Sequence, residues 1–126
     1  MTDAFPITIF HNPACGTSRN TLATIRAAGY EPTVVDYLKT GWTRPQLEAL
    51  FAAMAVRPRE AMRERGSPAA ELGLLDPAAT DDEIIDAMVA HPVLVNRPIV
   101  VTPLGAGLAR PAELVLPLLE RQPSNR

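Results

Sequence analysis

The chain has one cysteine, Cys15, among 126 residues, and this scarcity excludes several classes of protein. An internal disulfide needs two thiols and a cysteine-based metal cluster needs several, so neither can form. The two histidines, His11 and His91, lie far apart in the sequence and form no metal-binding motif. We therefore expect no metal and no bound cofactor, and the lone thiol favours a reducing, cytoplasmic location.

Long apolar runs and a large excess of one charge are also missing. The longest apolar stretches, such as 99–101, fall far short of the roughly 20 residues that cross a bilayer. An acid stands at Asp3, where a signal peptide would carry basic residues. The net charge of -2 argues against a general attraction to nucleic acid. We expect neither membrane nor nucleic acid as a partner. Lys39 is the only lysine, so the basic side chains are almost all arginines, whose planar donor groups suit oxyanions.

What the chain does contain is an ordered series of strand and helix signals. Strands are predicted at 7–10, 33–37, 99–102 and around 106–108 from their β-branched and aromatic residues. Helices are predicted at 18–28, 43–54, 59–65, 80–91 and 112–119. Thr80, with Glu83 three residues later, forms a capping-box signature.

These signals predict an α/β fold with a βαβ half, a ββα half and a mixed sheet. The helical insertion between the halves covers about 43–92. We expect a single domain over 1–121, followed by a frayed tail at 122–126.

Cys15 lies in the turn between the first predicted strand and the first predicted helix. A helix N-terminus offers free N–H groups and a partial positive charge, which favour a thiolate and can hold an oxyanion. His11 and Arg19 can add positive charge, and Gly16 leaves room for an anion near the backbone. The alternative is a buried, apolar cysteine. The polar loop favours the nucleophile.

The residues after Cys15 limit its chemistry. Thioredoxin-type enzymes use Cys-x-x-Cys, but Ser18 occupies the second cysteine position. An external thiol must therefore resolve any covalent redox intermediate. A phosphatase-like anion loop needs an arginine six residues after the cysteine, and Thr21 stands there instead.

Three arginines outside this turn, Arg63, Arg97 and Arg110, have different local contexts. Arg97-Pro98 precedes an apolar strand, where the proline is either a cis-proline or a strand-edge proline. Arg63 and Arg110 have no local signal of their own, and an arginine in such a context is by default a solvated surface residue.

The segment 11–22, HNPACGTSRNTL, resembles the active-site signature of the glutaredoxin-coupled arsenate reductases. Further matches follow in the same order as in that family: 31–33, 72–74, 80–82, 91–92 and 96–105. The resemblance covers roughly residues 6–120, and the two long motifs are highly specific.

The resemblance implies a thioredoxin-like fold and the reduction of arsenate to arsenite. The Cys15 thiolate attacks arsenate, glutathione forms a Cys15–As–glutathione intermediate, and glutaredoxin with further glutathione completes the reduction. Glutathione is thus a co-substrate and glutaredoxin a partner.

The family pattern also implies residue roles. Arg63, Arg97 and Arg110 correspond to three substrate-binding arginines, and His11 to a residue that helps keep Cys15 ionised. Gly16 is assigned to substrate binding, and structural roles fall to three residues: Ser18, Arg19 and Pro98. We expect a monomer. Two alternatives are a glutathione-dependent reductase of another substrate and a non-enzymatic module related to regulators that bind RNA polymerase.

Overall fold

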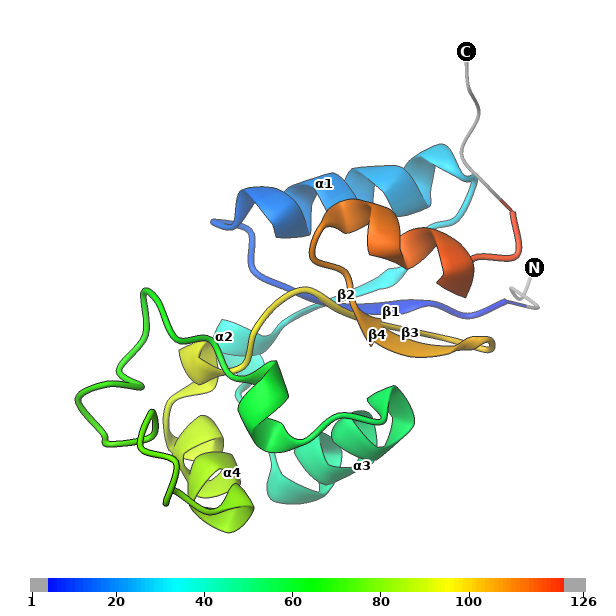
Figure 1. Ribbon diagram of the computed structural model, residues 1–126. Coiled ribbons are helices and arrows are strands. Elements are labelled where there is room, and N and C mark those ends of the chain that lie inside the picture. Colours follow the sequence, from blue (N-terminus) through cyan, green and yellow to red (C-terminus); the bar gives the residue numbers. More distant parts are fainter. Residues whose placement is uncertain (1–4, 122–126) are drawn as a thin grey trace. The chain divides into compact units, whose positions relative to one another are not determined.

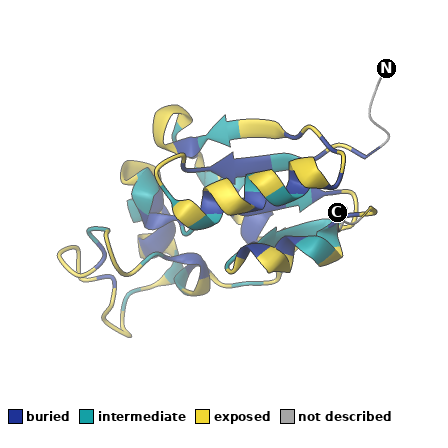
Figure 2. Ribbon diagram, turned by 90° about the horizontal axis from the view of Figure 1, so that it is seen from above, coloured by how far each residue is buried: buried dark blue, intermediate teal, exposed yellow. Residues whose placement is uncertain are grey.

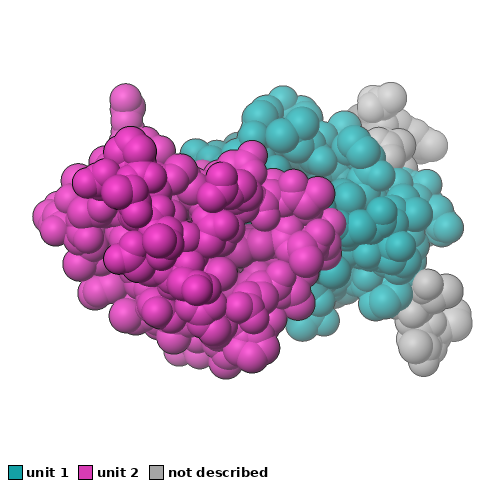
Figure 3. Space-filling model, turned by 60° about the horizontal axis from the view of Figure 1, so that its bottom comes forward, with its two compact units in different colours: residues 1–37, 97–126 teal, residues 38–96 magenta. Residues whose placement is uncertain are grey.

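The computed structural model describes residues 5–121 (Figure 1). Its elements follow in this order: β1 (Thr8–His11), α1 (Gly16–Ala27), β2 (Thr33–Asp36), α2 (Tyr37–Thr40), α3 (Arg44–Met54), η1 (Pro58–Ala61), α4 (Asp81–Ala90), η2 (Pro92–Leu94), β3 (Ile99–Thr102), β4 (Gly105–Leu108) and η3 (Ala112–Leu118). The chain divides into two compact units, coloured separately in Figure 3. The first contains the residues up to Tyr37 and those from Arg97 onward, and the second is Leu38–Asn96.

The first unit is built on a four-stranded sheet with the order β2-β1-β3-β4. β1 pairs parallel with β2, while β3 is antiparallel to both β1 and β4. The mixed sheet predicted from the sequence is therefore confirmed. Helices α1 and η3 lie side by side over one face of this sheet (Figure 1). Their apolar residues form a core with the strands, from Phe5, Ile7, Ile9, Ile25, Ala28, Tyr30, Val100, Ala109, Val115 and Leu119.

Helix α1 begins directly after Cys15, which is its N-cap with extended dihedral angles, φ -96° and ψ 122°. Gly29, at φ +93°, follows the helix in a conformation that favours glycine. Along its length α1 alternates between exposed and buried residues (Figure 2). The fully buried side chains near its start are polar, Ser18 and Thr21, and only Ile25 continues that face as an apolar residue.

The end of the described chain is fastened to the far end of α1. The Arg121 guanidinium lies 4.4 Å above the centre of the Tyr30 ring, a cation–π geometry. Its Nη2 donates to the Gly29 carbonyl at 3.2 Å, and the Arg121 backbone N–H donates to the Tyr30 hydroxyl at 2.9 Å. These contacts give a donor to the Gly29 carbonyl, just beyond the end of the helix.

The second unit contains α3 and α4, each begun by a capping box. Thr80 Oγ1 accepts from the Glu83 backbone N–H at 3.1 Å, and Glu83 Oε1 accepts from the Thr80 N–H at 2.8 Å. The predicted capping box is confirmed, and Thr43 with Gln46 forms a second one. Arg44 in α3 pairs with three carboxylates of this unit: Glu48, Asp82 and Asp86.

Two predicted helices differ from the structure. The helix expected over 59–65 is a single 3-10 turn, Pro58–Ala61. The last helix, expected at 112–119, is the 3-10 helix Ala112–Leu118, which contains Pro117. Proline lacks the N–H that an α-helical turn would use.

The predicted domain boundaries can be set beside the observed units. The predicted insertion over 43–92 falls within the second unit, Leu38–Asn96. The single domain over 1–121 stays a prediction, and the predicted tail at 122–126 lies outside the described residues. Within residues 5–121, no helix is long and apolar enough to cross a membrane.

Candidate active site

The loop before α1 holds Cys15 through backbone and side-chain hydrogen bonds. The Cys15 N–H donates to the Asn12 carbonyl at 3.0 Å, and the Cys15 carbonyl accepts from the Arg19 N–H at 3.0 Å. Asn12 Oδ1 accepts from the Ala14 N–H at 3.0 Å, which closes the turn. The thiol is partly exposed. The loop therefore presents a fixed but accessible sulfur at the start of a helix.

The electrostatic surroundings of Cys15 favour its thiolate. Partial burial acts to raise the pKa of the thiol, but the Ser18 backbone N–H and the guanidinium groups of Arg97 and Arg110 outweigh it. Together they lower the pKa of Cys15 to about 7. A large fraction of the sulfur is therefore ionised at neutral pH, as a nucleophile requires.

Arg110 contacts the sulfur directly. Its Nη1 lies 3.6 Å from Cys15 Sγ and also donates to the Arg97 carbonyl at 3.1 Å. The Arg97 side chain is buried, with 8% of the residue exposed. Both arginines precede cis prolines, Pro98 and Pro111, so the cis alternative for Pro98 is the observed one. Arg97 precedes β3 and Arg110 follows β4, so both arginines lie at the open end of this antiparallel hairpin, and both guanidinium groups act on the same thiol.

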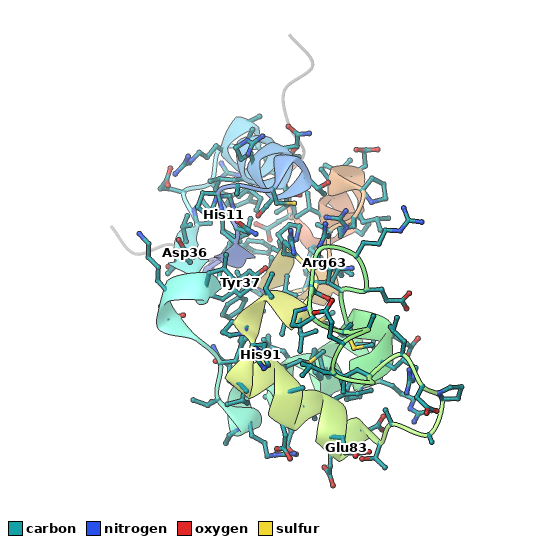
Figure 4. All side chains as sticks on the ribbon, turned by 90° about the vertical axis from the view of Figure 1, so that its left-hand side faces the viewer. His11, Asp36, Tyr37, Arg63, Glu83 and His91 are labelled. Atoms are coloured by element: carbon teal, nitrogen blue, oxygen red, sulfur yellow. The ribbon has the colours of Figure 1, made fainter. Side chains whose placement is uncertain are left out.

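His11 contacts the site through Ser18. Its Nδ1 lies 2.7 Å from Ser18 Oγ, and the same hydroxyl accepts from the Asn12 N–H at 3.1 Å. Burial lowers the pKa of His11, against the opposing effect of Asp36, its partner across the β1–β2 pair (Figure 4). The imidazole is therefore harder to protonate than a free one. His11 supports the turn whose Ser18 N–H faces the sulfur, rather than adding a positive charge.

Gly16 and Arg19 lie on the exposed side of the loop. Arg19 Nη1 donates to the Pro13 carbonyl at 2.9 Å, which ties the loop to the first helical turn. A Cβ on Gly16 would meet Arg19 Nη2 at 3.7 Å, an ordinary contact. The described fold therefore does not itself require glycine at position 16.

Arg63 belongs to the second unit, and Figure 4 labels it there. The backbone N–H of Arg63 donates to the Leu94 carbonyl at 2.7 Å, beside the antiparallel bridge between Met62 and Val95. Its Nη1 reaches Asn96 Oδ1 at 3.4 Å.

Two neighbouring arginines of the second unit have structural partners instead. Arg57 pairs with Asp81. Arg59 donates to three backbone carbonyls of the following loop, those of Leu74, Asp76 and Ala79. Arg57 and Arg59, which lie close to Arg63 in the sequence, thus have partners that differ from those of Arg63.

The first unit thus brings together five of the residues singled out from the sequence: His11, Cys15, Ser18, Arg97 and Arg110. Sequence reasoning missed Asn12, whose side chain shapes the turn. Its position before Pro13 is the one available signal, because Asn-Pro favours turns. Within residues 5–121, no three histidine, cysteine or acidic side chains are grouped to hold a metal ion.

The sheet and the site define a class of protein. An activated thiol at the start of a helix, next to two arginines, suits nucleophilic attack on an oxyanion. The fold and the chemistry are those of a thioredoxin-like, thiol-dependent enzyme.

Comparison with known proteins identifies the family. The model of the ArsC family matches residues 10–117, and the chain belongs to this family. It is 61% identical to an arsenate reductase of Rhizobium meliloti (strain 1021), over 90% of this chain and 81% of the relative. It is 56% identical to an arsenate reductase of Escherichia coli (strain K12), over 90% of this chain and 80% of the relative. A solved arsenate reductase from Vibrio cholerae superposes with a TM-score of 0.88 at 38% identity, covering 93% of this chain and 100% of that one.

Proposed function

We propose that this chain reduces arsenate to arsenite with Cys15 as the nucleophile. The observation that carries the proposal is the contact between Arg110 Nη1 and Cys15 Sγ, 3.6 Å apart at the start of α1. It places a cation beside the thiolate where an oxyanion must arrive. The names of the relatives, arsenate reductases at more than half identity, supply the oxyanion.

The cations of the site counter the repulsion between two anions. Thiolate and arsenate are both negatively charged, so their approach is opposed unless positive groups lie between them. Arg97 and Arg110 can each donate to an arsenate oxygen, and a hydrogen bond from a charged group contributes roughly 1.5–3 kcal/mol. The N–H groups at the start of α1 add further donors. On the family resemblance we assign Arg63 to the same task, and Gly16 to leaving room for the anion.

The reaction consumes two glutathione molecules, and glutaredoxin carries the first glutathione to the second. Cys15 Sγ bonds to arsenic and one oxygen leaves as water. Glutathione sulfur then bonds to arsenic and a second oxygen leaves as water. A glutaredoxin thiolate attacks the glutathione sulfur, and the S–As bonding pair stays on arsenic, which is reduced from As(V) to As(III). Hydrolysis of the Cys15–As bond releases arsenite and restores the thiol. A second glutathione frees glutaredoxin as glutathione disulfide forms.

The need for external thiols follows from the composition of the chain. Cys15 is its only cysteine, so no second thiol of the same chain can attack the intermediate. Ser18, at the position of a resolving cysteine, has its hydroxyl committed to His11 and Asn12. Glutathione and glutaredoxin fit this requirement, and their abundance in the cytoplasm agrees with a reduced thiol.

The test is arsenate-dependent NADPH oxidation in the presence of glutathione, glutaredoxin and glutathione reductase. The wild-type chain is expected to turn over, and Cys15→Ser is expected to reduce the rate to background. Retained turnover in Cys15→Ser would remove Cys15 as the nucleophile. Turnover of a disulfide substrate without turnover of arsenate would favour the alternative, a glutathione-dependent reductase of another substrate.

A further inference from the structure

The carbonyl of Ala109 lies at a junction between α1 and the strand that precedes Arg110. Ala109 is buried, with 1% exposed, and its N–H donates to the Pro98 carbonyl at 2.9 Å. On the other side, its carbonyl accepts from Thr21 Oγ1 at 3.4 Å. The residue before Arg110 is therefore tied both to the proline that follows Arg97 and to the helix that begins at Cys15.

Thr21 is placed to make this tie by its position in α1. Its side chain is fully buried, and its hydroxyl also donates to the Thr17 carbonyl at 2.9 Å. Its one hydroxyl proton has two carbonyl acceptors within reach, that of Thr17 at 2.9 Å and that of Ala109 at 3.4 Å. A buried carbonyl without a donor would be costly, so the hydroxyl favours this position of Ala109.

The arginine that follows this junction points back to the thiol. Arg110 Nη1 reaches both Cys15 Sγ and the Arg97 carbonyl. The guanidinium can keep both contacts only while the distance between the Arg110 backbone and α1 stays constant. In an anion loop of the phosphatase type, an arginine at position 21 would itself supply the cation. Here position 21 carries a hydroxyl, and the cation comes from Arg110.

We propose that Thr21 is a positioning residue that holds Arg110 against Cys15 through the Ala109 carbonyl. The proposal rests on the proposed function only in that Arg110 serves the thiolate during arsenate reduction. Thr21 does not touch the sulfur. Its effect on the reaction must therefore pass through Arg110, which makes the proposal testable by a double-mutant cycle.

The charged and titratable groups near the thiol limit what a pH readout can mean. Arg97 and Arg110 both hydrogen-bond to Cys15 and lower the pKa of its thiol. His11 lies behind Ser18, with Asp36, Arg19 and Arg26 acting on it. None of these groups contacts Thr21 in the described hydrogen bonds. If a substitution at Thr21 shifts the pKa of Cys15, the shift therefore reports on the contact between Arg110 and Cys15.

The experiment measures two quantities in each variant, kcat/KM for arsenate and the pH midpoint of Cys15 alkylation by iodoacetamide. Thr21→Val keeps the shape but removes the hydroxyl. It is expected to lower kcat/KM by about three- to tenfold, the effect of one hydrogen bond, and to move the alkylation midpoint upward. Thr21→Ser keeps the hydroxyl and is expected to stay within about twofold of wild type.

The matched control is Thr24→Val in the same helix. Thr24 Oγ1 donates to the carbonyl four residues earlier, Asn20, at 2.9 Å, and makes no described bond outside α1. This variant is expected to leave both quantities at wild-type values. An equal effect of Thr24→Val and Thr21→Val would assign the loss to the helix and overturn the proposal. If Thr21→Val does not fold, Thr21→Ala gives the same test.

The decisive comparison uses the Arg110→Ala background. If Thr21 acts through Arg110, adding Thr21→Val to Arg110→Ala causes no further change in either quantity. A full additional loss in the double variant would overturn the proposal. The alkylation measurement contains no arsenate. If wild type fails to reduce arsenate while Thr21→Val still moves the alkylation midpoint, the proposed function fails and the positioning role stands.

Discussion

Nη1 of Arg110 lies 3.6 Å from Sγ of Cys15, although 95 positions separate the two residues in the chain. The contact exists because β3 pairs with β1, the strand that leads to Cys15, and β4 pairs with β3. The hairpin therefore brings Arg110 back next to Cys15. It joins the most reactive side chain to a fixed positive charge. The predictions below follow from this contact and from the network around it.

The first prediction concerns the titration of Cys15. The rate of alkylation by iodoacetamide is expected to rise with pH around a midpoint of about 7, because only the thiolate reacts. Arg110→Ala removes a hydrogen bond that stabilises the charged form, so the midpoint moves upward. Arg26→Ala, an exposed arginine paired with Glu31, is the control and is expected to leave the midpoint unchanged. An unshifted midpoint in Arg110→Ala would contradict the role of this contact.

The second prediction concerns the buried hydroxyl of Ser18. Ser18→Ala leaves His11 Nδ1 and the Asn12 N–H without their partner in a buried loop. The free energy of unfolding is expected to fall by about 1–3 kcal/mol, the cost of unsatisfied buried polar groups. Urea unfolding measures the change, and Thr24→Ala, which loses an exposed bond, is expected to stay within about 0.5 kcal/mol of wild type. Equal stability of the two variants would rule out a special role for the Ser18 network.

The third prediction concerns Arg63 in the second unit. If it binds the oxyanion, Arg63→Ala lowers kcat/KM for arsenate by roughly ten- to a hundredfold, the loss of one hydrogen bond to a charged group. Arg65→Ala, an exposed arginine two residues further on, is the matched control. The alkylation rate of Cys15 measured without arsenate distinguishes lost substrate binding from a damaged thiol. Equal rates of arsenate reduction in the two variants would remove Arg63 from the site.

The fourth prediction concerns the start of α4. Thr80→Ala removes the hydroxyl that accepts from the Glu83 N–H, and helix caps of this kind contribute typically about 1 kcal/mol. Thermal unfolding is expected to show this loss, while Thr40→Ala, at an exposed hydroxyl, should be close to neutral. A stability of Thr80→Ala equal to that of Thr40→Ala would mean that the capping box contributes nothing measurable.

The predicted elements that the structure confirms are those determined by local signals. The strand at Ile99–Thr102 and the capping box at Thr80 depend on residues adjacent in sequence, so pattern and propensity suffice. The helix expected at 112–119 is present as the 3-10 helix Ala112–Leu118, and Pro117 within it supplies no N–H for an α-helical turn. The helix expected at 59–65 shortened because the residues after Ala61 pair with the segment around Val95 instead.

In the candidate site, too, the sequence predicts what local residues determine and misses what contacts between distant segments determine. Cys15 and its turn could be found from the sequence, because the loop and the helix that follows it are local. The hydrogen bond from Thr21 to Ala109 could not, because it joins two residues that are 88 positions apart in the sequence and meet only in the folded chain. Without the family resemblance, Arg110 would have remained an ordinary surface arginine. Its role depends on the return of a distant hairpin.

The stacking of Arg121 on Tyr30 has a practical consequence for handling the protein. The end of the described chain is held next to Gly29, while Cys15 lies at the other end of α1, a helix of 12 residues and about 18 Å. A dye or linker attached at the exposed Glu120, beside Arg121, would lie about one helix length from the thiol. This position therefore suits a label that must stay away from the reactive sulfur.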